Sequence, residues 1–184
     1  MPKPRKMLND FNAPYIKSLM GLIETQSAET ISKWCAAYAK ENLLPLYEEA
    51  FPEDPRPRIA LDASQTYTAE TTTKEKATKA AAIKSLKSAV KECNNAAREA
   101  ESNPAAQAAA RACGGAAGCI YTPTLSIGLA FYGALALAYH THGTTAPWET
   151  LESHAANECT KMESALNKIA IQNEPNPAKI NWNC

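Results

Sequence analysis

The sequence predicts an all-α fold, a compact bundle of six or seven helices. Apolar residues recur at steps of three and four along residues 13–172, the spacing that places side chains on one face of a helix. No stretch shows the strict alternation of apolar and polar residues that marks a half-buried strand. A chain of 184 residues can bury one sizeable core, so we expect residues 1–184 to form a single helical domain with irregular ends at 1–12 and 173–184.

The first two helices are predicted from their start signals. Asn12 and Pro14 are typical of the first turn of a helix, and Ser27 can cap a second one. Four apolar residues of the second helix share one face: Ile31, Trp34, Cys35 and Tyr38. Pro45 lacks an amide donor and disfavours helical geometry at the residue before it, so we expect the chain to bend or restart there.

A proline-rich corner ends this first helical region. Three prolines lie within residues 51–58, an arrangement that a turn with extended flanks accommodates. A third helix is expected from Pro57 through Ile59, Ala63 and Tyr67, and it should end at the three threonines of residues 71–73.

The next helices carry stronger patterns. A fourth helix over residues 74–101 has the clearest amphipathic series, with these members: Ile83, Leu86, Val90, Cys93, Ala97 and Ala100. Asn103 and Pro104 supply the cap and first-turn proline of a fifth, alanine-rich helix that reaches Gly114. Thr145 and Pro147 open the last helix, and Trp182 indicates that the tail docks on the bundle.

Residues 112–139 contain no charged side chain, so they are tested as a membrane span. Glycines, threonines and Pro123 keep the first half weakly hydrophobic. The strongly apolar part, residues 125–139, rises about 22 Å at ~1.5 Å per residue, which is short of a hydrocarbon core of ~30 Å. We therefore predict a central apolar helix near residues 123–140 inside the bundle, and no membrane association.

The segment Gly114–Gly118 predicts close packing of backbones, either within the chain or across a dimer. It is not a phosphate-binding loop, because the lysine, the hydroxyl and the preceding strand of such a loop are missing.

Charge and cysteine content limit which binding partners and which cellular compartment we expect. The 19 basic and 19 acidic residues give a net charge of zero, so the overall field favours neither nucleic acid nor an anionic membrane as a partner. No apolar run of signal-peptide length follows the charged start, and the six cysteines form no Cys-x-x-Cys pair. Reduced thiols in the cytoplasm fit this pattern best.

The sequence offers no clear catalytic or metal-binding pattern. His140 and His142 lie near a predicted helix end, and His154 and Glu158 lie four positions apart on the last predicted helix, so these residues are the candidates for a metal site. Carboxylate-bridged metal bundles need paired Glu-x-x-His motifs on facing helices, and the chain has none. We therefore expect no metal, no cofactor and no enzymatic activity, and a metal-binding enzyme using these histidines stays as the alternative.

The proline-rich corner is the best candidate for partner binding. Its charged residues lie around rigid turns: Glu53, Asp54, Arg56, Arg58 and Asp62. Asp62 lies four positions after Arg58, within reach of a same-face ion pair. A stiff loop that presents guanidinium groups loses little order on binding, although a purely structural corner would show the same pattern.

The stretch from Leu43 to Asp62, LLPLYEEAFPEDPRPRIALD, resembles a bacterial family of immunity proteins of polymorphic toxin systems. The likeness extends over residues 28–169, with an alanine-rich hairpin and a small-residue segment after the corner, and only the corner is specific. Family members tend to carry histidines where this chain has Gly115 and Tyr121, so no role of those histidines transfers. The resemblance implies an all-helical protein that binds and neutralises a toxin.

These observations together predict a protein interface rather than a reaction. The partner would be a protein such as a cognate toxin, and the Glu53–Asp62 corner would contact it. The alternatives are the histidine-based metal enzyme and a self-associating structural protein, a homodimer with the glycine-rich helix at its symmetric interface.

Overall fold

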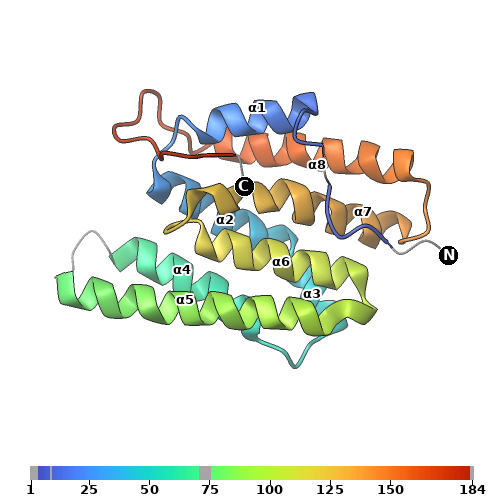
Figure 1. Ribbon diagram of the computed structural model, residues 1–184, viewed down its shortest axis with the longest axis horizontal. Coiled ribbons are helices and arrows are strands. Elements are labelled where there is room, and N and C mark those ends of the chain that lie inside the picture. Colours follow the sequence, from blue (N-terminus) through green and yellow to red (C-terminus); the bar gives the residue numbers. More distant parts are fainter. Residues whose placement is uncertain (1–3, 9, 71–75, 183–184) are drawn as a thin grey trace.

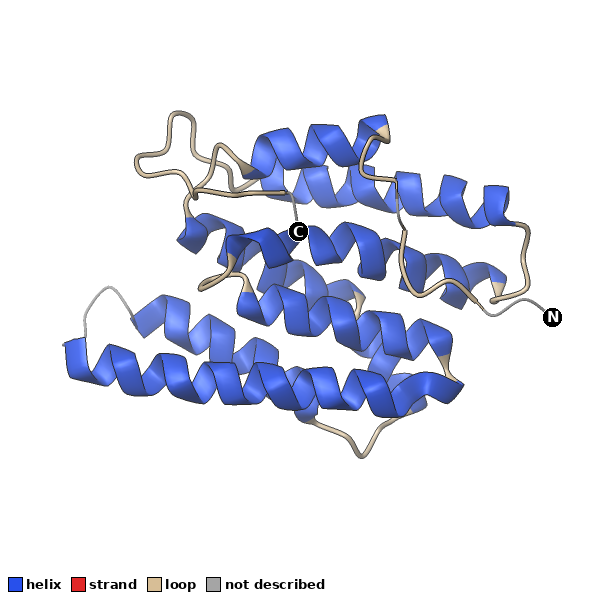
Figure 2. Ribbon diagram, in the orientation of Figure 1, coloured by secondary structure: helices blue, strands red, loops and turns tan. Residues whose placement is uncertain are grey.

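The computed structural model describes residues 4–8, 10–70 and 76–182, and along these residues the regular elements are helices only (Figures 1 and 2). The α-helices run as follows: α1 Pro14–Ile23, α2 Ala28–Asn42, α3 Leu44–Ala50, α4 Arg56–Glu70, α5 Lys76–Glu99, α6 Pro104–Gly118, α7 Ala134–His142 and α8 Trp148–Asn167. The predicted all-α fold is confirmed. The bend expected at Pro45 divides the second predicted helix into α2 and α3.

The helices lie side by side in layers (Figure 1). Helices α1 and α8 pack together along one side of the molecule, and α4 and α5 pack together along the opposite side. Helices α2, α6 and α7 lie between these pairs, and α6 contacts α2, α3, α4, α5 and α7. The alanine-rich α6 is therefore the element around which the two sides are joined.

Helix starts follow the capping signals in most places. The Ser27 hydroxyl accepts a hydrogen bond from the Thr30 amide at 3.2 Å, and the Asn103 side chain accepts one from the Ala106 amide at 3.1 Å. At α1 the expected role of Asn12 was wrong, because Ala13 is the cap residue and its side chain has no polar atom to bond the helix. Pro14 does occupy the first turn, as predicted.

Small residues let the central helices approach closely. Helix α6 extends to Gly118, four residues past its predicted end, so the glycine segment lies inside the helix. A Cβ atom on Gly115 would lie 3.1 Å from the Leu125 carbonyl oxygen, and one on Gly133 would lie 2.7 Å from Leu43 Cδ1. The predicted close packing thus occurs within the chain.

The uncharged stretch is buried as predicted but is not one regular helix. It begins with a 3₁₀ turn over Pro123–Ile127, continues as a π-helical turn over Leu129–Gly133, and becomes α-helical in α7. Most of its side chains from Leu129 to Tyr139 are buried, so this segment and α6 together form the centre of the bundle. None of the helices in the described part of the chain combines the length and apolar character needed to cross a bilayer.

Both irregular ends are held against the bundle. The Leu8 amide donates to the Phe131 carbonyl at 2.9 Å, and Tyr139 Oη donates to the Arg5 carbonyl at 2.8 Å. In the tail, the Ala178 amide donates to the Gln26 carbonyl at 2.8 Å, and Trp182 Nε1 donates to the Glu24 carboxylate. The expectation that Trp182 docks the tail is confirmed. The predicted helix end at residues 71–73 and Cys184 lie outside the described residues.

Candidate protein-binding site

The corner between α3 and α4 is built around one carboxylate. Arg56 donates to Asp54 through Nε at 2.8 Å and through Nη2 at 2.7 Å, and Tyr47 Oη donates to Asp54 Oδ2 at 2.5 Å. The Arg56 amide also donates to Asp54 Oδ1 at 3.1 Å, which closes the turn before α4. Arg56 Nη2 reaches Glu99 Oε2 at 2.5 Å and so ties the corner to the end of α5.

These contacts fix the charge state of the corner. The hydrogen bonds from Arg56 lower the pKa of Asp54 to about 2 and outweigh the opposing effect of burial. Burial, and then the hydrogen bond to Asp54, raise the pKa of the Tyr47 hydroxyl, which therefore stays protonated and donates. The corner is a rigid, internally bonded unit at ordinary pH.

The more exposed charges of the corner pair with other helices. Arg58 donates to Glu48 through Nε at 2.7 Å and through Nη2 at 2.6 Å. Asp62 accepts from Lys40 Nζ at 2.7 Å. The expected ion pair between Arg58 and Asp62 was therefore wrong, because each residue has a closer partner on α3 or α2. Glu53 is exposed on the turn itself.

Beside this corner, α4 and α5 enclose a shallow hollow of about 310 Å³. Its lining combines corner residues with one face of α5: Arg56, Ile59, Ser85, Ser88, Ala89 and Glu92. Ile59 is 52% exposed, whereas its neighbours Ala60 and Leu61 are fully buried. The sequence pattern placed Ile59 on the apolar line of its helix and missed the α5 wall, whose small residues at 85, 88 and 89 were the available signal.

The structure brings together three of the four residues considered for a metal. His142 Nε2 lies 3.1 Å from His154 Nδ1, and His154 Nε2 lies 3.5 Å from Glu158 Oε1. His140 lies apart, with Nδ1 4.0 Å from Glu49 Oε2. Along the described ranges no group of three or more histidine, cysteine or acidic side chains has an arrangement that could hold a metal ion.

Burial governs the chemistry of the histidine pair and of the thiols. The pKa of His154 is lowered mainly by burial, with the neighbouring Glu158 opposing the change. The five cysteines in the described residues are buried and unbridged: Cys35, Cys93, Cys113, Cys119 and Cys159. Burial raises the pKa of Cys93 and Cys159 to about 12, so these thiols are neutral and are poor nucleophiles. These five buried cysteines therefore serve as small apolar residues of the core.

Comparison with known proteins gives one family. The family model described as "Imm-5 like putative immunity protein" matches residues 21–165, which include the whole corner and both walls of the hollow. No curated protein and no solved structure matches the chain. Because the match covers well over half of the sequence and contains the segment that carried the resemblance, this chain belongs to the Imm-5 like family.

Proposed function

We propose that this protein binds a bacterial toxin and neutralises it through a protein–protein interface, without catalysing a reaction. Family membership over residues 21–165 is the observation that carries the proposal. The neutral, buried thiols support it, because they offer no activated nucleophile. Unbridged cysteines also support a cytoplasmic location, where thiols stay reduced.

We propose that the corner and the hollow beside it form the toxin-binding surface. Ile59, which is 52% exposed, lies among charged residues of both signs, an arrangement typical of an apolar contact with a polar rim. The side chain of Arg58 is 47% exposed although its guanidinium is held by Glu48. Side chains that are already fixed lose little conformational entropy when a partner binds, so such a surface favours tight association.

Growth rescue tests the function. The chain is expressed in a bacterial host together with the toxin domain encoded by the neighbouring reading frame, and growth is followed beside isolation of the complex. We expect restored growth and an equimolar complex. Unrestored growth with no complex, for every neighbouring toxin domain, would contradict the proposal.

A matched pair of substitutions tests the surface. Ile59→Glu places a charge on the lining of the hollow and should weaken toxin binding by about tenfold or more. Ile171→Glu makes the same change at a side chain that is 50% exposed on the C-terminal tail, and binding should be unchanged. Equal binding by both variants, with both folded by circular dichroism, would place the interface elsewhere.

A further inference from the structure

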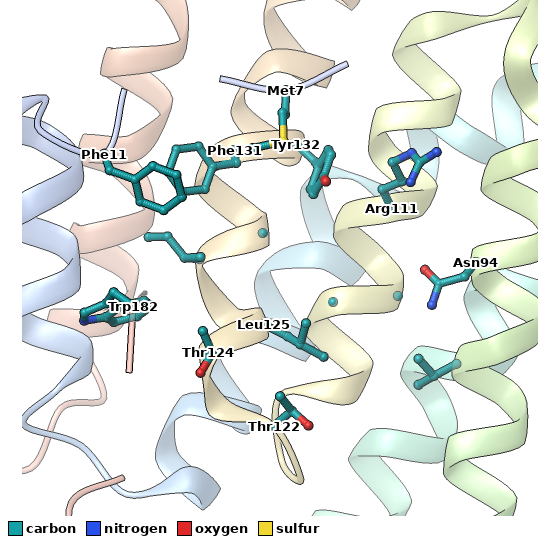
Figure 3. A pocket seen from close by; sticks show the side chains of 15 residues that line it. Met7, Phe11, Asn94, Arg111, Thr122, Thr124, Leu125, Phe131, Tyr132 and Trp182 are labelled. Carbon is teal, nitrogen blue, oxygen red and sulfur yellow. The ribbon is translucent and has the colours of Figure 1, made fainter. Parts of the chain in front are cut away.

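A second, larger cavity shares none of its lining residues with the hollow beside the corner. It has a volume of about 420 Å³ and is bordered by α5, α6 and the segment 122–132 (Figure 3). The N-terminal segment contributes Met7 and Phe11 to its edge, and the tail contributes Trp182. This volume lies within the range of ~300–1,000 Å³ that is usual for small-molecule sites.

The walls of this cavity are apolar, and part of its floor has no side chains. Phe11, Leu125 and Phe131 are among its apolar lining residues. Gly114, Gly115 and Gly128 also line the cavity. The rings of Phe11 and Phe131 pack with their centroids 4.4 Å apart, so they form one continuous apolar wall.

One cation at this cavity, Arg111, has no ion-pair partner among the described residues. Arg111 is partly buried, and its Nε is buried without a hydrogen-bond acceptor. The Arg111 guanidinium lies beside the Tyr132 ring, whose centroid is 5.9 Å from Arg111 Cζ, and no acidic side chain among the described residues forms an ion pair with it. Arg56, the other partly buried arginine among the described residues, is paired with Asp54 and Glu99. A buried guanidinium N–H without an acceptor is costly, so an acceptor from outside the chain would stabilise the site.

We propose that this cavity binds a small amphipathic monocarboxylate. Its carboxylate would accept hydrogen bonds from the Arg111 guanidinium, whose planar fork matches a carboxylate. Asn94 and Thr124 line the same cavity and supply further polar atoms, and the hydrocarbon body would lie on Phe11, Leu125 and Phe131. A single guanidinium balances the one charge of a carboxylate better than the higher charge of a phosphate monoester.

Titration of the whole chain with dodecanoate, below its micelle concentration, tests the proposal without any toxin. We expect saturable binding by calorimetry and a change in tryptophan fluorescence. Trp182 lines the cavity, whereas Trp34 and Trp148 do not, so Trp182→Phe should remove most of the fluorescence change. Dodecanol, which has no charge, should bind about tenfold or more weakly than dodecanoate.

Arg111→Met keeps an apolar stem of similar length and removes the charge, and it should weaken dodecanoate binding by about tenfold or more. Arg98→Met is the matched control, because Arg98 is exposed on α5 and lies outside the cavity lining. Leu125→Asp is a second variant that places a negative charge, the same sign as that of the ligand, on the cavity wall and should also weaken binding. Three results would overturn the proposal: no saturable binding, equal binding of dodecanol and dodecanoate, or equal binding by the Arg111 and Arg98 variants. Loss of toxin binding in Arg111→Met without any alkanoate binding would assign the cavity to the toxin instead.

Discussion

At the scale of single residues, Asp54 is where the corner is most sensitive. Its carboxylate accepts hydrogen bonds from both Arg56 and Tyr47, and its side chain is only 19% exposed. We expect Asp54→Asn to lower the free energy of unfolding by about 2–3 kcal/mol, because charge-assisted bonds are lost and Arg56 keeps only Glu99. Urea denaturation measures this, and Glu53→Gln on the exposed turn should change stability by less than about 0.5 kcal/mol.

The same carboxylate predicts an acid response. Its pKa is about 2 in the folded protein against an ordinary value of 3.8, so the stabilisation is fully present above pH 3.8 and is lost as the pH falls through 2. The difference in stability between the native protein and Asp54→Asn should therefore shrink across this window. Denaturant midpoints measured from neutral pH downward would reveal it, and a constant difference would contradict it.

His154 predicts a response at milder pH. Its pKa is lowered from 6.5, mainly by burial, so folding favours the neutral ring. Stability should be fully present above pH 6.5 and should decline as the pH falls through the lowered pKa. Thermal melts of His154→Gln should show a weaker decline over this window, whereas the exposed His140→Gln should keep it. An identical pH profile for all three proteins would contradict this assignment.

At the scale of elements, the π-helical turn depends on one close contact. A Cβ on Gly133 would lie 2.7 Å from Leu43 Cδ1 and 3.4 Å from Ala112 Cβ, so Gly133→Ala should destabilise the fold by about 1–3 kcal/mol. Gly21 in α1 has nothing within 4 Å of a Cβ at that position. There the same substitution should stabilise by about 0.5–1 kcal/mol, because alanine is the better helix former. Chemical denaturation of both variants compares the two signs directly.

Helices with a polar face could be predicted from the sequence, and the uncharged segment could not be predicted in detail. The apolar series of α5 predicts which face of this helix points into the core, and Leu86, Val90 and Cys93 on that face are buried. Residues 123–140 are apolar on nearly every side, so no pattern marks where a 3₁₀ turn, a π turn or an α-helix begins. Contacts with Leu43 and α6 decide that geometry, and they come from distant parts of the chain.

At the scale of the whole molecule, hydrogen bonds to Glu174 hold the C-terminal tail against the start of α2. Glu174 accepts hydrogen bonds from the Ser27 amide at 2.7 Å, the Ser27 hydroxyl at 2.8 Å and the Thr30 hydroxyl at 2.7 Å. Glu174→Ala should lower the free energy of unfolding by about 1–3 kcal/mol, since the Ser27 amide loses its partner. Hydrogen exchange should increase along the tail in this variant, and not in the exposed Lys179→Ala control.

Only part of the candidate site could be predicted from the sequence, because the rest forms only when distant helices pack together. The prolines and charges of residues 51–58 are local in the sequence, so the corner could be recognised. Its ion pairs could not be assigned, because Lys40, Glu48 and Glu99 come from three other helices and reach Asp62, Arg58 and Arg56 only after packing. Arg111 and its cavity likewise require α5, α6 and both ends of the chain to be assembled.

The buried cysteines give the molecule built-in reporters of its own opening. They lie in α2, α5, α6 and α8 and just after α6, so nearly every layer holds a thiol that a reagent can reach only when that layer opens. With Cys184→Ser removing the thiol outside the described residues, labelling times read by mass spectrometry would rank the layers by local stability. Bound toxin or bound carboxylate would then slow labelling in different layers, which would distinguish the two surfaces without any engineered probe.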